Sequence, residues 1–309
     1  MNALEDHAAD YLRLRRHLGF ALAGHESLLR QFTVYLAETG QEAITVEAAL
    51  AWAGSPSKGA VAEPVLRAAN RLTAVRGFAQ YLHAIDPTHQ VPPRGVFVAA
   101  RRRREPFIYD SLQVAALLRA AEALGSGQGR TWATIFGLLA ATGMRSGEAL
   151  SLRQADADLR SGVLSVVGKN HRPRLVPLHP STVEALASYT WWRDREQPAP
   201  PGAEAMFFTG SRGGRVSYGA VRGAFVRASH AAGLRDGRTL PRLHDLRHTF
   251  AVTALLNWHR DGADVAAMLP VLSTYLGHAN PVDTYWYLSA IPELMGYAAG
   301  RLSTGGPRV

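Results

Sequence analysis

The sequence has 309 residues, of which 47% are hydrophobic and 19% are charged, so the chain can bury sizeable cores and lacks the composition of a disordered protein. It contains no cysteine, which excludes a disulfide framework and a thiolate metal site. The formal net charge of +9 favours a polyanionic partner, most often nucleic acid. Of the 34 basic residues only two are lysines, Lys58 and Lys169, so a lysine in this chain invites a chemical explanation.

The N-terminus and the longest apolar stretch bear on the cellular location of the protein. The opening residues, MNALEDHAAD, are acidic and contain no apolar run, which argues against a secretory signal. The longest uncharged apolar stretch, residues 131–144, suits a buried helix better than a membrane span. We therefore expect a soluble cytoplasmic protein that associates with the nucleoid when it is bound to DNA.

The first part of the chain is predicted to be a helical domain. Apolar residues recur at helical spacing over residues 10–19, 25–40, 45–54 and 63–85, with Thr45 available as an N-cap. Pro87, Pro92, Pro93 and Gly95 then interrupt the pattern. We predict a helical domain at 1–90, a basic linker at 91–105 and a second domain at 106–309.

Arginines are dense around this predicted boundary. Between Val65 and Arg104 there are eight arginines and one acid, Asp86, which is typical of a strip that follows DNA phosphates. The alternative is a solvated basic face. The residues predicted to contact DNA are Arg67, Arg71, Arg101, Arg102, Arg103 and Arg104.

The second part of the chain is predicted to be mostly helical with one β-hairpin. Helical periodicity covers residues 111–124, 131–144, 181–196, 218–234, 243–259 and 263–278. Residues 162–179 place two Val- and Leu-rich strands around the polar turn GKNHRP. The predicted fold class is therefore mainly α with a small β-hairpin or sheet, in two domains.

Several separated segments carry residues suited to phosphate chemistry. Arg145 stands at a predicted helix start, where the helix dipole disfavours a cation, so it needs an anionic partner, and Glu148 could be that partner within the chain. His244 and Arg247 share a helical face. His248, four residues after His244, has metal-ligand spacing, but no third ligand is evident. Arginine forks bind phosphoryl oxygens and stay charged at any working pH.

The last of these segments, LGHANPVDTYWY, contains His278 and two tyrosines. Tyr285 and Tyr287 are two residues apart, so on a helix they point in nearly opposite directions, about 200° apart. Only one of them can face a given site. The residues alone leave open which one it is.

These segments resemble the tyrosine recombinase (phage integrase) family. The resemblance rests on TGMRSGEAL around Arg145, VVGKNHRPRLVPL around Lys169, HDLRHTFA around His244 and Arg247, and LGHANPVDTYWY around His278 and Tyr287. It spans about residues 105–295, and a preceding helical domain that clamps DNA is also usual in that family. The family interval favours Tyr287 over Tyr285 as the nucleophile.

The resemblance implies a site-specific DNA recombinase, either an integrase or a transposon-borne enzyme, that uses a 3′-phosphotyrosyl intermediate and neither metal nor ATP. In the mechanism that the resemblance implies, Tyr287 attacks the scissile phosphate and His244 acts as general base or proton relay. Arg145 and Arg247 hold the nonbridging oxygens and His278 donates a further hydrogen bond. Lys169 protonates the 5′-oxygen, a role that arginine cannot fill because it keeps its proton too tightly.

The same resemblance implies partners and leaves two alternatives. It implies double-stranded recombination sites, a homotetramer on two DNA sites and room for accessory DNA-bending proteins. Residues 289–309 could form a tail that docks on a neighbouring subunit or back on its own chain. One alternative is a DNA-binding factor without catalysis. The other is a type IB topoisomerase that relaxes DNA as a monomer.

Overall fold

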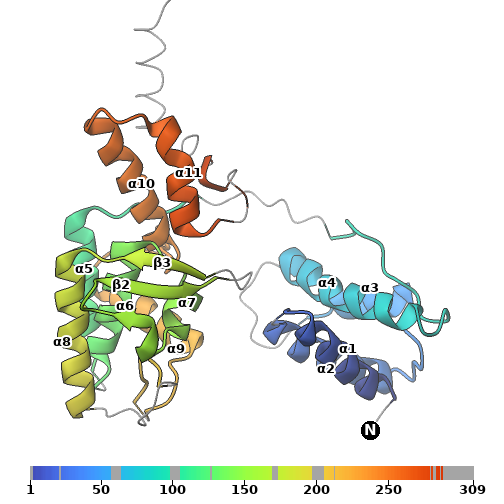
Figure 1. The fold of residues 1–309 in the computed structure, drawn as a ribbon. Helices are drawn as coiled ribbons and strands as arrows, with labels where there is room; N and C mark the ends of the chain where they lie inside the picture. Colours follow the sequence, from blue (N-terminus) through green and yellow to red (C-terminus); the bar gives the residue numbers. More distant parts are fainter. Residues whose placement is uncertain are drawn as a thin grey trace, which may run out of the picture. The chain divides into compact units, whose positions relative to one another are not determined.

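The computed structural model describes residues 3–20, 22–56, 64–97, 105–125, 127–168, 173–196, 205–211, 213–278, 280, 283–285 and 287. The chain divides into two compact units, Met1–Arg103 and Arg104–Val309. This division falls within the stretch predicted as a linker, residues 91–105. Each unit is described by itself (Figure 1).

The first unit is a bundle of helices. Its elements are α1 (Ala3–His17), α2 (Ala23–Glu38), α3 (Val46–Gly54) and α4 (Pro64–His83). As predicted, the Thr45 side chain caps α3 by accepting a hydrogen bond from the Ala48 N–H. Helix α4 packs against the other three, because Leu72, Val75, Phe78 and Leu82 recur at helical spacing and are all buried.

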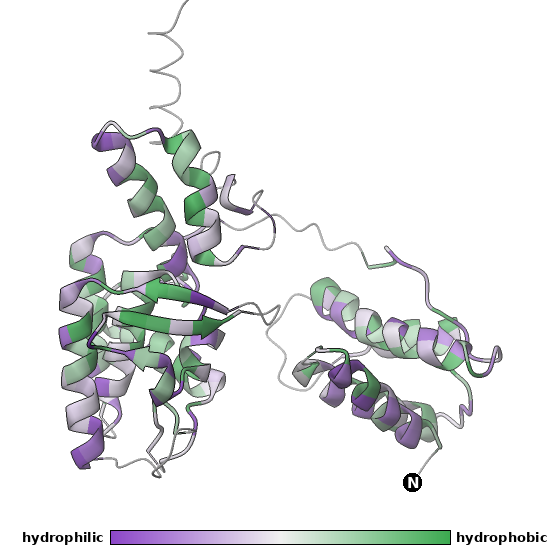
Figure 2. Cartoon of the chain, in the orientation of Figure 1, coloured by the Kyte–Doolittle hydropathy of each residue, from purple (hydrophilic) through white to green (hydrophobic). Residues whose placement is uncertain are grey.

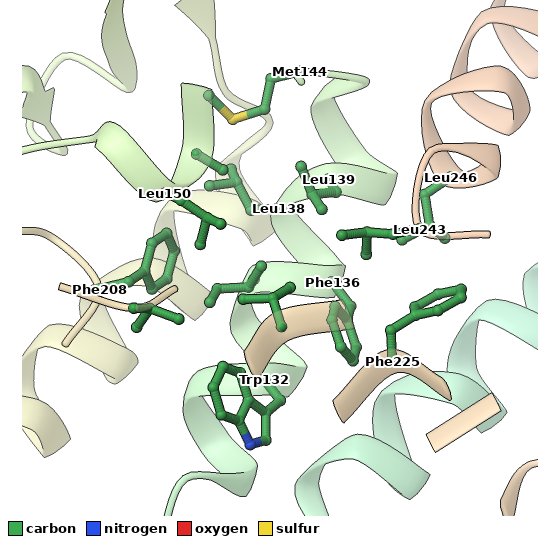
Figure 3. Close-up of a cluster of buried hydrophobic side chains, with 14 of the residues drawn as sticks. Trp132, Phe136, Leu138, Leu139, Met144, Leu150, Phe208, Phe225, Leu243 and Leu246 are labelled. Carbon is green, nitrogen blue, oxygen red and sulfur yellow. The ribbon is translucent and has the colours of Figure 1, made fainter. Parts of the chain in front are cut away.

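The second unit is also mostly helical. Its helices are α5 (Ser111–Glu122), α6 (Gly129–Thr142), α7 (Ser146–Ser151), α8 (Pro180–Glu196), α9 (Tyr218–Ala231), α10 (Asp245–Arg260) and α11 (Val265–Leu276), with a 3₁₀ turn, η1, at Gln154–Asp156. Helix α6 lies at the centre and contacts α5, α8, α9 and α10. Its burial pattern explains this position, since Trp132, Ile135, Phe136 and Leu139 cover one face of the helix (Figure 3).

The β structure is a three-stranded antiparallel sheet in the order β1 (Ala157–Asp158), β2 (Val163–Val167) and β3 (Pro173–Pro177). The hairpin of β2 and β3 was predicted, but the short strand β1 was not. Leu164 and Val176 pair across the hairpin and both face the core. In Figure 2 the hydrophobic colour is concentrated on these strands and on the packed faces of the helices.

Two hydrophobic cores hold the second unit. The larger lies around α6 and includes Phe136, Phe208, Phe225 and Leu246 (Figure 3). The smaller joins α10 and α11 and includes Val252, Leu255, Leu272 and Tyr287. Tyr287 thus packs against α10, which carries Arg247, and against α11.

The structure confirms the fold class and corrects the extent of one helix. The first helix begins at Ala3 rather than near residue 10, because Leu4 and Ala8 continue the buried face formed by Tyr11 and Leu12. Among the residues described, no helix is both long and apolar enough to cross a membrane. The predicted tail, 289–309, lies outside the described residues.

Candidate active site

The site is built around Arg145, which lies two residues after the glycine that ends α6. Gly143 ends α6 in the left-handed conformation, with φ of 59°, and a Cβ there would lie 2.5 Å from Cδ1 of Phe250. Arg145 is the N-cap of α7, as its predicted place at a helix start requires. Its backbone N–H donates to Oε2 of Glu148 at 2.8 Å and its Nη1 donates to Oε1 at 2.9 Å. Glu148 is therefore a partner of Arg145 within the chain, a possibility that the sequence left open.

Glu148 binds a second arginine that the sequence reasoning missed. Arg174, on β3, donates from Nη1 and Nη2 to the two carboxylate oxygens of Glu148, at 2.9 and 2.7 Å. Burial alone would raise the pKa of Glu148, but the hydrogen bonds from Arg174 and Arg145 outweigh it and hold that pKa below its usual value. Glu148 thus stays ionised and fixes two guanidinium groups. The signal for Arg174 was its position two residues before the inward-facing Val176, on the buried side of a strand.

Three arginines also converge on the carboxyl end of α11. Arg174 Nε donates to the Tyr275 carbonyl at 2.9 Å, Arg247 Nη2 to the Leu276 carbonyl at 2.8 Å, and Arg145 Nη2 to the Gly277 carbonyl at 2.7 Å. The last carbonyls of a helix lack partners within it and carry partial negative charge. The backbone carbonyls at the end of α11 therefore hold the three arginines in place without adding a formal charge.

Arg247 is the most deeply placed of the three, at 2% exposed. Its Nη1 donates to the Gly143 carbonyl at 2.8 Å, so it ties the end of α6 to the end of α11. Desolvation and the nearby charge of Arg145 lower its pKa to about 10, and it remains a cation at neutral pH. The two predicted phosphate ligands, Arg145 and Arg247, are thus brought together.

His278 lies next to these arginines and is neutral. It follows Gly277, and its Nδ1 is 2.6 Å from Oγ1 of Thr284. Desolvation, followed by repulsion from Arg247 and Arg145, lowers the pKa of His278 to about 4. At neutral pH it is therefore an uncharged hydrogen-bonding group.

His244 is the N-cap residue of α10. Desolvation, with repulsion from Arg247 as the next cause, lowers its pKa to about 4. Because His244 is exposed overall, water offsets part of this desolvation, and the repulsion from Arg247 is the cause that persists. Its ring lies edge to face against the ring of His248, with centroids 4.8 Å apart. Within the described residues no group of three His, Cys, Asp or Glu side chains could hold a metal ion.

The two tyrosines point in different directions. Tyr287 is 2% exposed and Tyr285 is 48% exposed. The hydroxyl of Tyr287 lies 2.9 Å from Nδ1 of His248, a contact that the sequence reasoning missed. The one sequence signal for this contact is the pair of histidines four residues apart, a spacing that also suits metal ligands. The tyrosine that faces the histidine and arginine cluster is therefore Tyr287.

The remaining predicted residues are placed less completely. Lys169 and Arg101–Arg104 lie outside the described residues, although the strands on either side of the Lys169 turn are described. Arg67 is on α4 and partly exposed. Arg71 is only 6% exposed, and its Nη1 donates to the carbonyls of Trp52 and Ser55 at 3.2 and 2.8 Å. The guanidinium thus caps the end of α3, and the predicted contact of Arg71 with DNA stays a prediction.

Comparison with known proteins identifies the family of the chain. The model of the phage integrase family matches residues 109–293. The integrase/recombinase y4rB of Sinorhizobium fredii is 39% identical over 98% of each chain, and tyrosine recombinase XerD of Mycobacterium leprae is 29% identical over 93% of this chain and 86% of that protein. The chain belongs to the phage integrase family.

Solved structures share the fold at low sequence identity. The Tn1549 transposon integrase in complex with transposon right-end DNA has a TM-score of 0.62 at 15% identity, covering 97% of this chain and 99% of that chain. The XerH recombinase in a post-cleavage complex with difH has a TM-score of 0.58 at 21% identity, covering 82% and 70%. These likenesses establish the fold alone.

Proposed function

We propose that this protein is a site-specific DNA recombinase that breaks and rejoins double-stranded DNA through Tyr287. The observation that carries the proposal is the Tyr287 hydroxyl, which lies 2.9 Å from a histidine on the same helix that bears Arg247. Charge interaction between Arg247 and Tyr287 supports this, since a phenolate formed there is attracted to the guanidinium. The family membership and the DNA-bound structural neighbours agree with it.

In the proposed reaction the Tyr287 oxygen attacks the scissile phosphorus and the bond to the 5′-oxygen breaks. A 3′-phosphotyrosyl bond forms, and the 5′-oxygen leaves as a hydroxyl. The 5′-hydroxyl of a second strand then reverses the step, so that no ATP is required. Covalent catalysis of this kind divides one difficult displacement into two easier ones.

Arg145 and Arg247 are proposed to bind the nonbridging oxygens of that phosphate. A guanidinium has five N–H donors, and the hydrogen bonds described above use two of them in each residue. The others remain for phosphoryl oxygens. His278, neutral and next to both arginines, is proposed to donate a further hydrogen bond, and His244 to relay protons beside His248.

Lys169 is proposed as the acid that protonates the leaving 5′-oxygen. The support is chemical, because lysine can release a proton near a phosphate and arginine cannot. It is also positional, because the turn between β2 and β3 holds one of only two lysines in the chain. Arg174 on β3 ties that hairpin to Glu148 and so to Arg145.

The proposed partners are DNA recombination sites and further copies of the chain. Among the structural neighbours are a lambda integrase dimer on a core site and a lambda integrase tetramer on a Holliday junction. We propose a homotetramer on two sites, with backbone contacts from Arg67 and the Arg101–Arg104 run. Accessory DNA-bending proteins are compatible with this assembly.

The test is adduct trapping on a nicked DNA site, sought first in the DNA that flanks the coding sequence. A gel-stable protein–DNA adduct is expected from wild type and from Tyr285→Phe, the matched control, and none from Tyr287→Phe. Loss of the adduct in Tyr285→Phe alone would assign the chemistry to the other tyrosine. Tight DNA binding with no adduct from wild type would identify a binding factor, and relaxation of supercoiled DNA without any target site would identify a topoisomerase.

A further inference from the structure

His248, which was not among the predicted catalytic residues, is the histidine that contacts the Tyr287 hydroxyl. It lies on the first turn of α10, one residue after Arg247. Its Nδ1 is 2.9 Å from the Tyr287 hydroxyl, and the two rings lie edge to face with centroids 5.5 Å apart. Among the described residues, His244 and Tyr287 form no hydrogen bond with each other. The imidazole next to the attacking atom is therefore that of His248.

We propose that His248 is a catalytic residue that accepts the phenol proton of Tyr287 through Nδ1. This inference rests on the proposed recombinase function. As the Tyr287 oxygen bonds to phosphorus, its O–H bond breaks and the proton passes to Nδ1, which leaves His248 as an imidazolium. In the reverse step that proton returns to the phenol oxygen as the phosphotyrosyl bond breaks. No metal, oxidant or further reactant enters the step.

The surroundings favour this direction of proton transfer. A free phenol has a pKa of about 10 and needs a proton acceptor near neutral pH. Among the described residues, His244 lies edge to face against the His248 ring and Arg247 interacts by charge with Tyr287, while Arg145 and His278 lie close to Arg247. Arg247 attracts the phenolate as it forms. Because Tyr287 is buried with its ring on α10 and α11, the acceptor is held in place before DNA arrives.

Asparagine at position 248 separates the hydrogen bond from the proton transfer. Its side-chain amide is attached at the same carbon as Nδ1, so it can hydrogen-bond the phenol but cannot take a proton at neutral pH. Single-turnover cleavage of the nicked site would be measured for wild type, His248→Asn and, as the matched control on an exposed helical surface, His230→Asn. We expect His248→Asn to cleave on the order of 10²–10⁴-fold more slowly at pH 7.5 and His230→Asn to match wild type.

The pH dependence adds a readout that a merely structural role would not move. The wild-type cleavage rate is expected to level off above the titration of an imidazole, at a pKa of about 6.5 in an unperturbed histidine. The rate of His248→Asn should continue to rise towards pH 10, as the phenol ionises without an acceptor. A wild-type rate and profile in His248→Asn would overturn the proton-transfer role while leaving the recombinase intact.

A second measurement needs no DNA, and its decisive reading is made on the wild-type chain. Nitrogen-15 NMR of the free wild-type chain reports which ring nitrogen of His248 carries hydrogen. The proposal requires hydrogen on Nε2 and a bare Nδ1 that accepts from Tyr287, with a changed Nδ1 shift in Tyr287→Phe. Hydrogen on Nδ1 at pH 7.5 would overturn the proposal. Absence of any adduct from wild type would instead overturn the recombinase function, and the proton-transfer step with it.

Discussion

Replacing Gly277 with alanine should damage the site through two separable effects. Gly277 ends α11 with a φ of 68°, a left-handed conformation that costs a residue with a Cβ about 1 kcal/mol relative to glycine. An added Cβ would also lie 2.9 Å from Nη1 of Arg174 and 3.4 Å from Nη1 of Arg145. The first contact is too short, so the Arg174 guanidinium must move.

The size of the second effect follows from what Arg174 would lose. Its guanidinium holds Glu148 at 2.7 Å and the Tyr275 carbonyl at 2.9 Å, and hydrogen bonds that involve a charged group contribute roughly 1.5–3 kcal/mol each. Weakening one of them adds about 2 kcal/mol to the backbone term, so Gly277→Ala should lower the free energy of unfolding by about 3 kcal/mol. Strand cleavage should fall as well, because Arg145 shares Glu148 with Arg174.

Gly262→Ala is the matched control. Gly262 also has a left-handed φ, 74°, but an added Cβ there would meet nothing within 4 Å. Its cost is therefore the backbone term alone, about 1 kcal/mol, with no loss of cleavage. Urea denaturation and single-turnover cleavage would be compared for the two variants. If both lose the same stability and both cleave normally, crowding of the arginines is not the reason for glycine at position 277.

Three further predictions concern Glu148, the arginines of α4 and His278. Glu148→Gln removes a buried carboxylate from two partly buried arginines, so urea denaturation should show a loss of roughly 3–5 kcal/mol. The loss should be under about 1 kcal/mol for Asp10→Asn in the exposed Arg13–Asp10 pair. Arg71→Ala should destabilise the first unit by about 2 kcal/mol, because it removes the buried hydrogen bonds to the end of α3. Arg67→Ala should leave stability unchanged and reduce the slope of log affinity for DNA against log salt concentration by about one. The reverse pattern would contradict the burial of Arg71. Finally, His278 has a pKa of about 4 in the folded chain and an ordinary value near 6.5 when unfolded. The unfolded chain therefore binds more protons between these values, and stability should fall as the pH drops from about 6.5 to 4, by at most about 3 kcal/mol for this residue. His278→Asn should flatten that part of the stability curve, and an unchanged curve would contradict the shift.

Local signals in the sequence were sufficient for much of the fold. Thr45 caps its helix because its hydroxyl oxygen can accept from the Ala48 N–H, which has no acceptor within the first turn. Glu148 could be named as a possible partner of Arg145 because residues three apart at a helix start lie side by side. The two-residue separation of Tyr285 and Tyr287 on a helix likewise fixed that only one of them could face the site.

What could not be predicted depends on contacts between distant segments. Arg71 has the sequence context of a basic DNA-binding helix, yet its guanidinium reaches the end of α3, and nothing local records where that end lies. Arg174 meets Glu148 across 26 residues, and His248 meets Tyr287 across 39. Each of these residue types is common on a surface, so only the packing of the second unit distinguishes them.

In the proposed reaction, the charge of the cluster would favour the transition state over the bound ground state. At the carboxyl end of α11 the described cluster holds three guanidinium groups, Arg145, Arg174 and Arg247, and one carboxylate, Glu148, a balance of 3 − 1 = +2. His278 adds no charge at neutral pH, because its pKa is about 4. A DNA phosphodiester carries one negative charge, whereas its five-coordinate transition state carries close to two. Since the arginines are anchored to backbone carbonyls before the phosphate arrives, they need little rearrangement as that second charge develops. Removing Glu148 would raise the charge to +3 but would free the arginines, so we expect tighter DNA binding together with slower cleavage. Faster cleavage in Glu148→Gln would mean that charge matters more than fixed position in this site.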